Sequence, residues 1–455
     1  MKIHFISIGG SVMHNLAIAL QERGNKITGS DDEIFEPSYS RLKAKGLLPE
    51  PFGWFPEKIT QDIDAVVLGM HAKRDNPELQ KAQELGLKIY SFPEYIYQQN
   101  QDKQRIVVAG SHGKSTVTSM IVHVMNTVQR PLDYLLGALP VGMDHTIRLT
   151  ERAPSIVIEG DEYLTSALDL NPKFLHYKHH VVVMTGIAWD HINVFPTLEA
   201  YTQQFVRLAE QTPKGGTIIY NSEDKVLSQL VKKANIQEDV TLIPYTSQKH
   251  KLKDGQTLLQ SENKDLYPVK FFGEHNMLNV SAVKEVCAKM GVSNEDFCKA
   301  MQSYQGLHMR MQLLVASGSV NVYRDFAHAP SKLKATVEAL KKQFPKRKLR
   351  ACFELHTYSS LNSEFIQQYK GAMKKADEAM VYFNPHTLEL KNMPPISPQQ
   401  LKDAFNDQNL KVFTNSDELH TYLSTQEWNA ANLALMSSGS FNNLDLEKLV
   451  GEITA

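Results

Sequence analysis

A glycine-rich stretch with a lysine, Gly110-Ser-His-Gly-Lys-Ser115, is the strongest chemical signal in this sequence of 455 residues. The two glycines let the backbone curl so that successive N–H groups face one point. An apolar segment, Ile106–Ala109, precedes the stretch, and a segment with an apolar stripe at helical spacing follows it. A helix N-terminus here adds partial positive charge, and Lys114 adds a full one. The pattern therefore predicts a loop that binds phosphate groups.

The loop indicates ATP as its ligand. The usual motif is GxxxxGK[ST], whereas Val108 stands here at the position of the first glycine, so that the loop is two residues shorter. A chance glycine turn with a solvated lysine is the alternative, and the flanking strand and helix patterns argue against it. Ser115 is placed to hold Mg²⁺ through its hydroxyl. The loop residues expected to bind ATP are Gly110, Ser111, His112, Gly113, Lys114, Ser115 and Thr116.

Acidic residues and a histidine follow two further apolar segments. Glu159-Gly-Asp-Glu162 comes directly after Ile156–Ile158, and Asp190-His191 follows Val181–Met184. The carboxyl ends of parallel strands meet at one edge of a sheet, where ligand sites form, and carboxylate oxygens suit Mg²⁺. A lone histidine is more often a packing or surface residue. Its coincidence with the phosphate loop and the acidic motif favours a role for His191 in phosphate or metal chemistry.

Alternating strands and helices must position these groups. Short apolar runs alternate with helical patterns throughout the chain, which predicts parallel βαβ units. We expect an α/β protein of three domains: an N-terminal Rossmann-like domain over residues 1–103, a central P-loop domain with a mostly parallel sheet over 104–306, and a C-terminal Rossmann-like domain over 307–455. The polar stretch Gln98–Gln104 is the expected linker between the first two.

The bulk composition excludes several classes of protein. Lys+Arg and Asp+Glu number 49 and 50, so no net charge indicates a nucleic-acid or membrane-surface partner. Three cysteines without a CxxC pair argue against a disulfide framework or a zinc knuckle. No apolar run approaches the length of a membrane span, and the N-terminus does not have the pattern of a signal peptide. We expect a cytoplasmic enzyme with no membrane insertion, and its oligomeric state is left open.

Several motifs together resemble those of the Mur ligase family, which builds the peptide stem of bacterial cell-wall precursors. The resemblance covers essentially the whole chain. It rests on the short phosphate loop, the acidic motif, the Asp190-His191 pair and three later stretches: Gly273-Glu-His-Asn276 with Leu278-Asn279, Arg310, and Asp325-Phe-Ala-His328. The resemblance implies one domain for a UDP-sugar, one for ATP, and a third that closes over the site.

The resemblance also implies roles for individual residues. Lys114, Glu159 and His191 would be catalytic, with Lys114 on the ATP phosphates, while Ser115, Glu159 and His191 would hold Mg²⁺. Asn276 would lie near the adenine, and Arg310 and Asp325 would approach the nucleotide from the third domain; a helix cap for Asn276 and a surface ion pair for Arg310 are the alternatives. His275 and His328 are expected nearby without a defined role, and His191 or His328 could accept the proton of the amine.

The N-terminal turn Gly9-Gly10-Ser11 is interpreted with the same resemblance. It is not GxGxxG, because position 14 is His, so it gives only a weak indication of a dehydrogenase. Backbone N–H groups of such a turn can hold the diphosphate of a UDP-sugar. We therefore expect Gly9, Gly10 and Ser11 to bind the UDP-sugar. Asp31 would face the uridine or ribose unless it is a solvated strand-end acid, and His71 is a weaker candidate.

Within this family, several stretches favour a ligase that joins L-alanyl-γ-D-glutamyl-meso-diaminopimelate to UDP-N-acetylmuramate through an acyl-phosphate, as in peptidoglycan recycling. They include Ile158–Tyr163, Lys173–Tyr177 and Leu435–Phe441. A ligase that adds L-alanine to the same acceptor is the alternative. A folate-polyglutamate ligase and a P-loop switch module are competing classes; the former lacks a Gly9-Gly10 type of first domain.

Some positions depart from the family pattern. Ser111 stands where Thr is usual, Met309 where a second Arg is frequent, and Ala329 where a second His is common. The segment Glu354–Ser359 also lacks the Arg that the alanine-adding ligases have. The amine-binding chemistry is therefore less well defined by the sequence than the ATP site.

Overall fold

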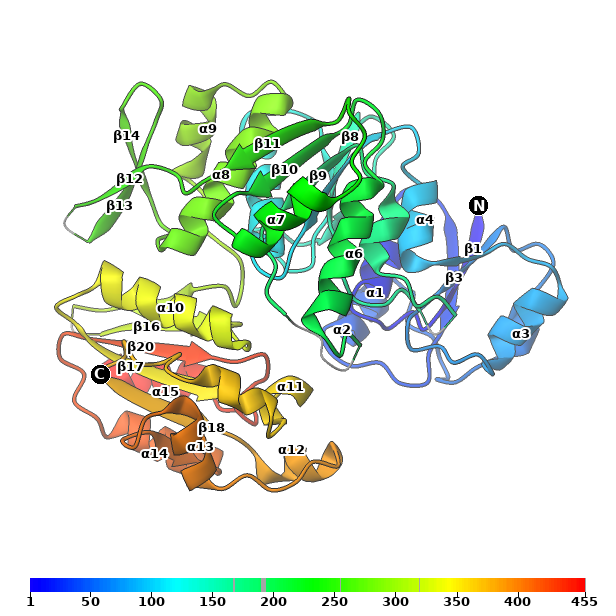
Figure 1. Ribbon diagram of the computed structural model, residues 1–455. Coiled ribbons are helices and arrows are strands. Elements are labelled where there is room, and N and C mark those ends of the chain that lie inside the picture. Colours follow the sequence, from blue (N-terminus) through cyan, green and yellow to red (C-terminus); the bar gives the residue numbers. More distant parts are fainter. Residues whose placement is uncertain (167, 190–193, 254, 319, 455) are drawn as a thin grey trace. The chain divides into compact units, whose positions relative to one another are not determined.

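The computed structural model describes residues 1–166, 168–189, 194–253, 255–318 and 320–454, which form two compact units (Figure 1). Of these described residues, the first unit contains 1–166, 168–187, 198–246 and 282–292. The second contains 188–189, 194–197, 247–253, 255–281, 293–318 and 320–454. The chain therefore passes between the units several times.

The first unit begins with a four-stranded parallel sheet in the order β2-β1-β3-β4. Its central strand β1 is almost entirely buried, because Ile3, Phe5 and Ile6 are apolar and strands lie on both of its edges. Helix α3 begins with the Asn76 side chain accepting the N–H groups of Glu78 and Leu79. The elements are β1 Lys2–Ile6, α1 Met13–Glu22, β2 Lys26–Ser30, α2 Ser38–Ala44, η1 Pro56–Lys58, β3 Ala65–Leu68, α3 Pro77–Glu84, β4 Ile89–Ser91 and α4 Phe92–Gln98.

A seven-stranded sheet in the order β11-β10-β9-β5-β8-β6-β7 follows in the same unit. All its pairs are parallel except β6 with β7. Strands β9, β5 and β8 are neighbours, so the residues that follow them lie at one edge of the sheet. The elements are β5 Gln104–Ala109, α5 Lys114–Thr127, β6 Asp133–Leu135, β7 Ile147–Arg148, β8 Ser155–Glu159, η2 Lys173–Tyr177, β9 Val181–Met184, α6 Leu198–Glu210, β10 Thr217–Asn221, α7 Lys225–Lys233 and β11 Thr241–Tyr245.

The second unit contains a small antiparallel sheet that the sequence did not predict, in the order β12-β13-β14. Its strands are β12 His250–Lys253, β13 Gln256–Gln260 and β14 Leu266–Val269. Helix α8 (Glu274–Lys289) begins in the second unit and ends in the first, and α9 (Asn294–Met301) follows it.

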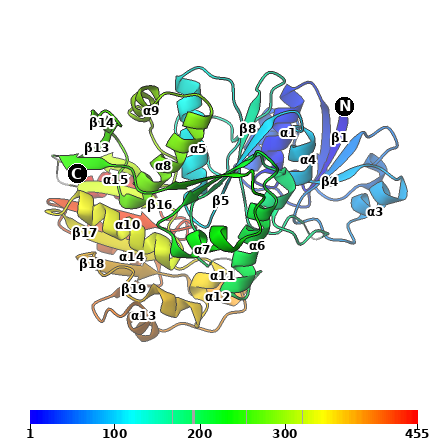
Figure 2. The same cartoon turned by 45° about the horizontal axis from the view of Figure 1, so that its top comes forward.

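A six-stranded sheet in the order β15-β16-β20-β17-β18-β19 forms the body of the second unit, with only β15 antiparallel. Alternate residues of β17 and β18 face opposite sides: Phe353 and Val381 belong to one apolar core, Cys352 and Met380 to another. Helices α10, α11 and α13 contribute to the first core, and α14 and α15 to the second. Figure 2 shows α10 lying across this sheet. The elements are β15 Gln312–Ala316, β16 Val320–Asp325, α10 Pro330–Gln343, β17 Lys348–Glu354, α11 Tyr358–Leu361, η3 Phe365–Tyr369, β18 Glu378–Tyr382, α12 Pro385–Leu390, α13 Pro398–Phe405, β19 Lys411–Phe413, α14 Ser416–Ser424, β20 Ala431–Met436 and α15 Leu446–Thr454.

The predicted fold class is confirmed, since each of the three expected segments contains its own mostly parallel α/β sheet. The domain boundaries at residues 103 and 306 stay predictions. Among the described residues, no helix is both long and apolar enough to cross a membrane.

Candidate active site

The phosphate loop connects β5 to α5, as the sequence predicted. Gly110 and Gly113 have φ angles of +132° and +80°, which side-chain-bearing residues rarely adopt. Next to the loop, Ser111 N donates to Gly186 O over 3.0 Å, and the Thr185 hydroxyl donates to the carbonyls of Ala109 and His112. The residues that follow β9 therefore fix the loop backbone through hydrogen bonds.

Lys114, the first residue of α5, is held by groups of its own unit. Its Nζ donates to Gly110 O over 2.6 Å and lies 2.8 Å from Glu162 Oε2. Burial lowers the pKa of Lys114, but the charge and hydrogen bond of Glu162, together with the charges of Asp161 and Glu159, outweigh burial and raise the net pKa. Lys114 is therefore a cation at every physiological pH.

Glu162 connects the loop to helix α6. Tyr201 Oη donates to Glu162 Oε1 over 3.0 Å and lies 2.9 Å from Ser111 Oγ. Glu162 and Tyr201 are both almost fully buried. This network fixes Glu162 and, through it, Lys114. His112 bonds through Nδ1 to Ser111 O, and Thr116 is half-buried on α5.

Ser115 and Glu159 form a second contact at the edge of the sheet. Ser115 Oγ donates to Glu159 Oε1, and the backbone N–H of Gly137 donates to Glu159 Oε2, each over 2.7 Å. A side chain at position 137 would collide with this carboxylate. A hydroxyl and a carboxylate held together in this way are the hard oxygen donors that Mg²⁺ prefers.

A third charged contact lies beside the first two. Lys173 Nζ, at the start of η2, is 2.6 Å from Asp161 Oδ2, and Tyr163 N donates to Asp161 Oδ1 over 3.1 Å. Burial raises the pKa of Asp161, but the charges of Lys173 and Lys114 outweigh burial and lower the net pKa. Asp161 therefore lies in the field of both lysines.

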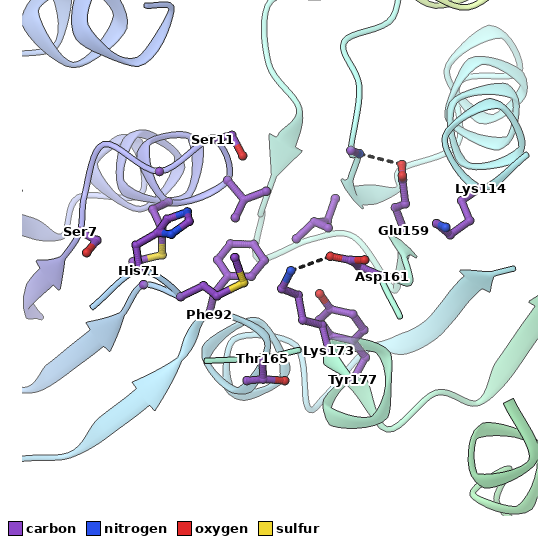
Figure 3. A pocket seen from close by; sticks show the side chains of 17 residues that line it. Ser7, Ser11, His71, Phe92, Lys114, Glu159, Asp161, Thr165, Lys173 and Tyr177 are labelled. Atoms are coloured by element: carbon purple, nitrogen blue, oxygen red, sulfur yellow. Dashed lines mark hydrogen bonds and ion pairs between the residues drawn. The ribbon is translucent and has the colours of Figure 1, made fainter. Parts of the chain in front are cut away.

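Lys114, Glu159, Asp161 and Lys173 line a cavity of about 310 Å³ within the first unit (Figure 3). Ser7, Ser11 and His71 lie at one end, Lys114 and Glu159 at the other, and Asp161 and Lys173 between them. The rest of the lining comes from Gly10, Val12, Met13, Gly69, Met70, Phe92, Leu135, Gly137, Thr165 and Tyr177. The cavity thus brings the predicted sugar-nucleotide residues Gly10, Ser11 and His71 together with the phosphate loop.

Gly9 and Asp31 support this cavity without lining it. Gly9 N donates to Asp31 Oδ2 over 2.7 Å, and Asp31 is 7% exposed. The His14 ring, at the position that breaks the dinucleotide motif, bonds through Nδ1 to Gly10 O over 2.9 Å. Burial lowers the pKa of His14, and Arg41 adds to this while the Gly10 carbonyl opposes it. Asp31 and His14 therefore hold the turn; a contact of Asp31 with uridine or ribose stays a prediction.

The second unit contains Asn276, Arg310 and Asp325. Asn276 donates to Phe272 O over 2.9 Å and is almost fully buried on α8, and the Arg310 guanidinium lies 4.5 Å above the centre of the Phe326 ring. Asp325, at the end of β16, accepts the N–H of Met311 over 3.1 Å. Asp325 thus fixes the backbone next to Arg310.

His275 and His328 belong to the same unit. Burial lowers the pKa of His275, against the opposing charges of Asp325 and Glu274. His328 bonds through Nδ1 to Phe326 O over 2.9 Å, and its ring packs edge-on against Phe326. The roles proposed for these residues stay predictions. His191 and Asp190 lie outside the described residues.

The sequence analysis did not select Asp161, Glu162, Lys173, Tyr177 or Tyr201 as site residues. Asp161 and Glu162 belong to the acidic motif already noted, so their position at a strand end was an available signal. Lys173 and Tyr177 fall in a stretch noted only for its family resemblance. Tyr201 lies on α6 at helical spacing from the apolar residues Phe205 and Leu208, a pattern that indicates packing rather than a polar contact.

Three family models match the chain in succession. A model described as "Mur ligase family, catalytic domain" matches residues 2–103, the "Mur ligase middle domain" matches 108–287, and "Mur ligase, glutamate ligase domain" matches 309–439. The resemblance inferred from the sequence motifs is therefore confirmed.

Individual relatives carry two different descriptions. A UDP-N-acetylmuramate–L-alanine ligase of Ligilactobacillus salivarius is 30% identical over 81% of each chain. A UDP-N-acetylmuramate–L-alanyl-γ-D-glutamyl-meso-2,6-diaminoheptandioate ligase of Haemophilus influenzae is 25% identical over 97% of each chain. Among solved structures, a UDP-N-acetylmuramate–alanine ligase of Thermotoga maritima is similar with a TM-score of 0.72 and 20% identity, over 99% of this chain and 98% of that one.

Proposed function

The chain belongs to the Mur ligase family, and we propose that it joins L-alanyl-γ-D-glutamyl-meso-diaminopimelate to the carboxylate of UDP-N-acetylmuramate. As a member of this family it is an ATP-dependent ligase that forms an amide bond. The observation that carries the proposal is the single cavity shared by Gly10 and Ser11 with Lys114 and Glu159. A sugar nucleotide held by the N-terminal turn would extend its acid towards the phosphate loop.

The reaction needs ATP because a free carboxylate is a poor electrophile. In the first step a carboxylate oxygen attacks the γ-phosphorus of ATP, ADP leaves, and an acyl-phosphate forms. The amine then attacks the acyl carbon, phosphate leaves with the electron pair of the C–O bond, and the nitrogen loses a proton. Lys114 would offset the charge of two anions that must approach each other in the first step.

We further propose that Mg²⁺ binds at Ser115 and Glu159. The hydroxyl and the carboxylate are oxygen donors fixed at the loop, which suits this ion. The neighbouring charged groups are three carboxylates, Glu159, Asp161 and Glu162, and two ammonium groups, Lys114 and Lys173. A bound Mg²⁺ supplies the positive charge that this set lacks when polyanionic ATP enters.

The tripeptide is preferred over L-alanine as the amine because the segment Glu354–Ser359 lacks the Arg found in alanine-adding ligases. The Haemophilus influenzae relative, which is named for the tripeptide, supports this preference. L-alanine is the second candidate, because relatives named as L-alanine ligases reach 30% identity. Both amines would use the same acyl-phosphate.

Phosphate release distinguishes the candidates. We expect turnover with ATP, UDP-N-acetylmuramate and the tripeptide, and at least about 10-fold slower turnover when L-alanine replaces the tripeptide. Reactions without the sugar nucleotide or without an amine measure uncoupled hydrolysis.

Lys114→Ala, checked for unchanged melting temperature, should remove most turnover. Activity only with L-alanine would replace the proposed substrate, and normal turnover of Lys114→Ala would refute the site.

A further inference from the structure

The cavity of the first unit contains a second lysine, Lys173, to which the reaction described above assigns no role. It is the first residue of η2, and its side chain is only 17% exposed. Its backbone N–H donates to Tyr163 O over 3.0 Å, and its Nζ lies 5.7 Å from the centre of the Tyr163 ring. The side chain is thus fixed at both ends and points along the cavity (Figure 3).

Asp161 accepts one hydrogen bond from Lys173, over 2.6 Å. An ammonium group has three donors, so two others can meet a ligand in the cavity. Tyr177 lines the same part of the cavity and is only 1% exposed. A ligand acid at this point would lie beside this buried ring and a lysine that is only 17% exposed, and such partial shielding from water strengthens a charge-assisted hydrogen bond.

The position of Lys173 along the cavity indicates which part of a ligand it meets. Figure 3 shows Lys173 and Asp161 between the N-terminal turn residues Ser7 and Ser11 and the loop residue Lys114. A diphosphate at the turn would place the opposite, acidic end of the molecule near Lys173. That acid must lie next to the γ-phosphate of ATP, and the two anions repel each other unless each has its own cation.

We propose that Lys173, oriented by Asp161, binds the reacting carboxylate of the sugar nucleotide while Lys114 binds the phosphates of ATP. This inference rests on the proposed function, because it takes UDP-N-acetylmuramate as the acceptor. Lys173 then selects sugar nucleotides that carry an acid from those that do not.

Calorimetric binding of two nucleotide sugars tests the proposal. UDP-N-acetylmuramate has the lactyl carboxylate, and UDP-N-acetylglucosamine has the same nucleotide and sugar without it. Lys173→Met should weaken binding of UDP-N-acetylmuramate about 10- to 100-fold. It should change binding of UDP-N-acetylglucosamine less than about 2-fold, and the KM for ATP should stay unchanged.

Lys178→Met is the matched control, because Lys178 follows the same short helix and is exposed. Lys173→Gln, which can still bond to Asp161, replaces Lys173→Met if the latter does not fold, and the same selective loss is expected. An equal loss for both sugars, or no loss for either, would overturn the role of Lys173. If the wild-type protein binds neither sugar, the proposed function fails and this inference fails with it.

Discussion

Asp31 directly follows β2, and its carboxylate accepts the N–H groups of Gly9, in the N-terminal turn, and of Asp32. Burial raises the pKa of Asp31 to about 6, although the hydrogen bond from Gly9 acts in the opposite direction. The unfolded chain releases this proton near pH 4. The folded state therefore binds the proton more tightly, and the contribution of Asp31 to stability is complete below about pH 4 and lost as the pH rises through about 6.

Asp31→Asn should remove this pH dependence, because the amide keeps an acceptor for Gly9 N and cannot ionise. The stability of the variant relative to the wild type should rise by on the order of 2 kcal/mol between pH 4 and pH 7. Amide hydrogen exchange of peptides covering β1 and Gly9, corrected for intrinsic rates, measures the local opening free energy.

Asp62→Asn is a control of opposite sign, because Lys2 and Thr60 lower the pKa of exposed Asp62 to about 2. Its contribution is present above about pH 4 and lost as the pH falls towards 2. If the local opening free energy changed with pH in the same way in the wild type and in Asp31→Asn, the pKa of Asp31 would not be raised.

The sequence predicts site residues where the chemistry is local. Lys114 and Ser115 follow two glycines within one short loop, so their joint role can be inferred without a fold. Tyr201 reaches Glu162 and Ser111 from a helix that begins at Leu198, far from the loop in the sequence. Contacts of this kind depend on how α6 packs on the sheet, which no local pattern states.

Gly110 shows how a turn between two elements depends on one residue. Its φ of +132° is a glycine conformation, and a Cβ there would collide with Thr185 and approach Gly186 O to 3.0 Å. Gly110→Ala should therefore move the loop away from β9 and weaken ATP binding at least about 10-fold, a change that roughly 1.4 kcal/mol produces. Calorimetry with a non-hydrolysable ATP analogue measures the effect.

Gly86→Ala is the matched control for Gly110→Ala. Gly86 also has a positive φ, +64°, but a Cβ there meets nothing within 4 Å. This control should lower stability by about 1 kcal/mol and leave ATP affinity unchanged. Equal ATP affinity in Gly110→Ala and the wild type would show that the loop tolerates the added methyl group.

The regular elements were predictable to different extents. Parallel strands such as β9 and β8 are buried, so their segments Val181–Met184 and Ile156–Ile158 read as continuous apolar runs and were found. Strand β12, with the sequence His-Lys-Leu-Lys and mostly exposed residues, has almost no apolar signal. The β12–β14 sheet is held by pairing along the hairpins and by Thr257 and Gly255, which contact Gln343 of α10.

On the scale of the whole molecule, residues 247–281 and the C-terminal part of the chain form one unit. Phe272 packs edge-on against Tyr323 and Phe344 and belongs to the apolar core under α10. Phe272→Ala should destabilise this unit by roughly 3–5 kcal/mol, the usual loss for a buried phenylalanine. Hydrogen exchange should become faster in β16 and α10 and stay unchanged in β1 and β5 of the other unit.

Phe271→Ala, at the neighbouring half-buried position, is a control, since Phe271 contacts Tyr304 rather than α10. It should leave exchange in α10 unchanged. If Phe272→Ala made hydrogen exchange faster to the same extent in both units, residues 247–281 would stabilise the two units equally.

The grouping of residues 247–281 with the C-terminal sheet has a consequence for synthesis on the ribosome. Phe272 cannot be covered until α10 has been made, roughly 70 residues later, and the sheet it helps to cover is complete only with β20, near the end of the chain. The nascent chain therefore carries an uncovered aromatic segment through much of its elongation, and transiently exposed apolar surface of this kind favours aggregation.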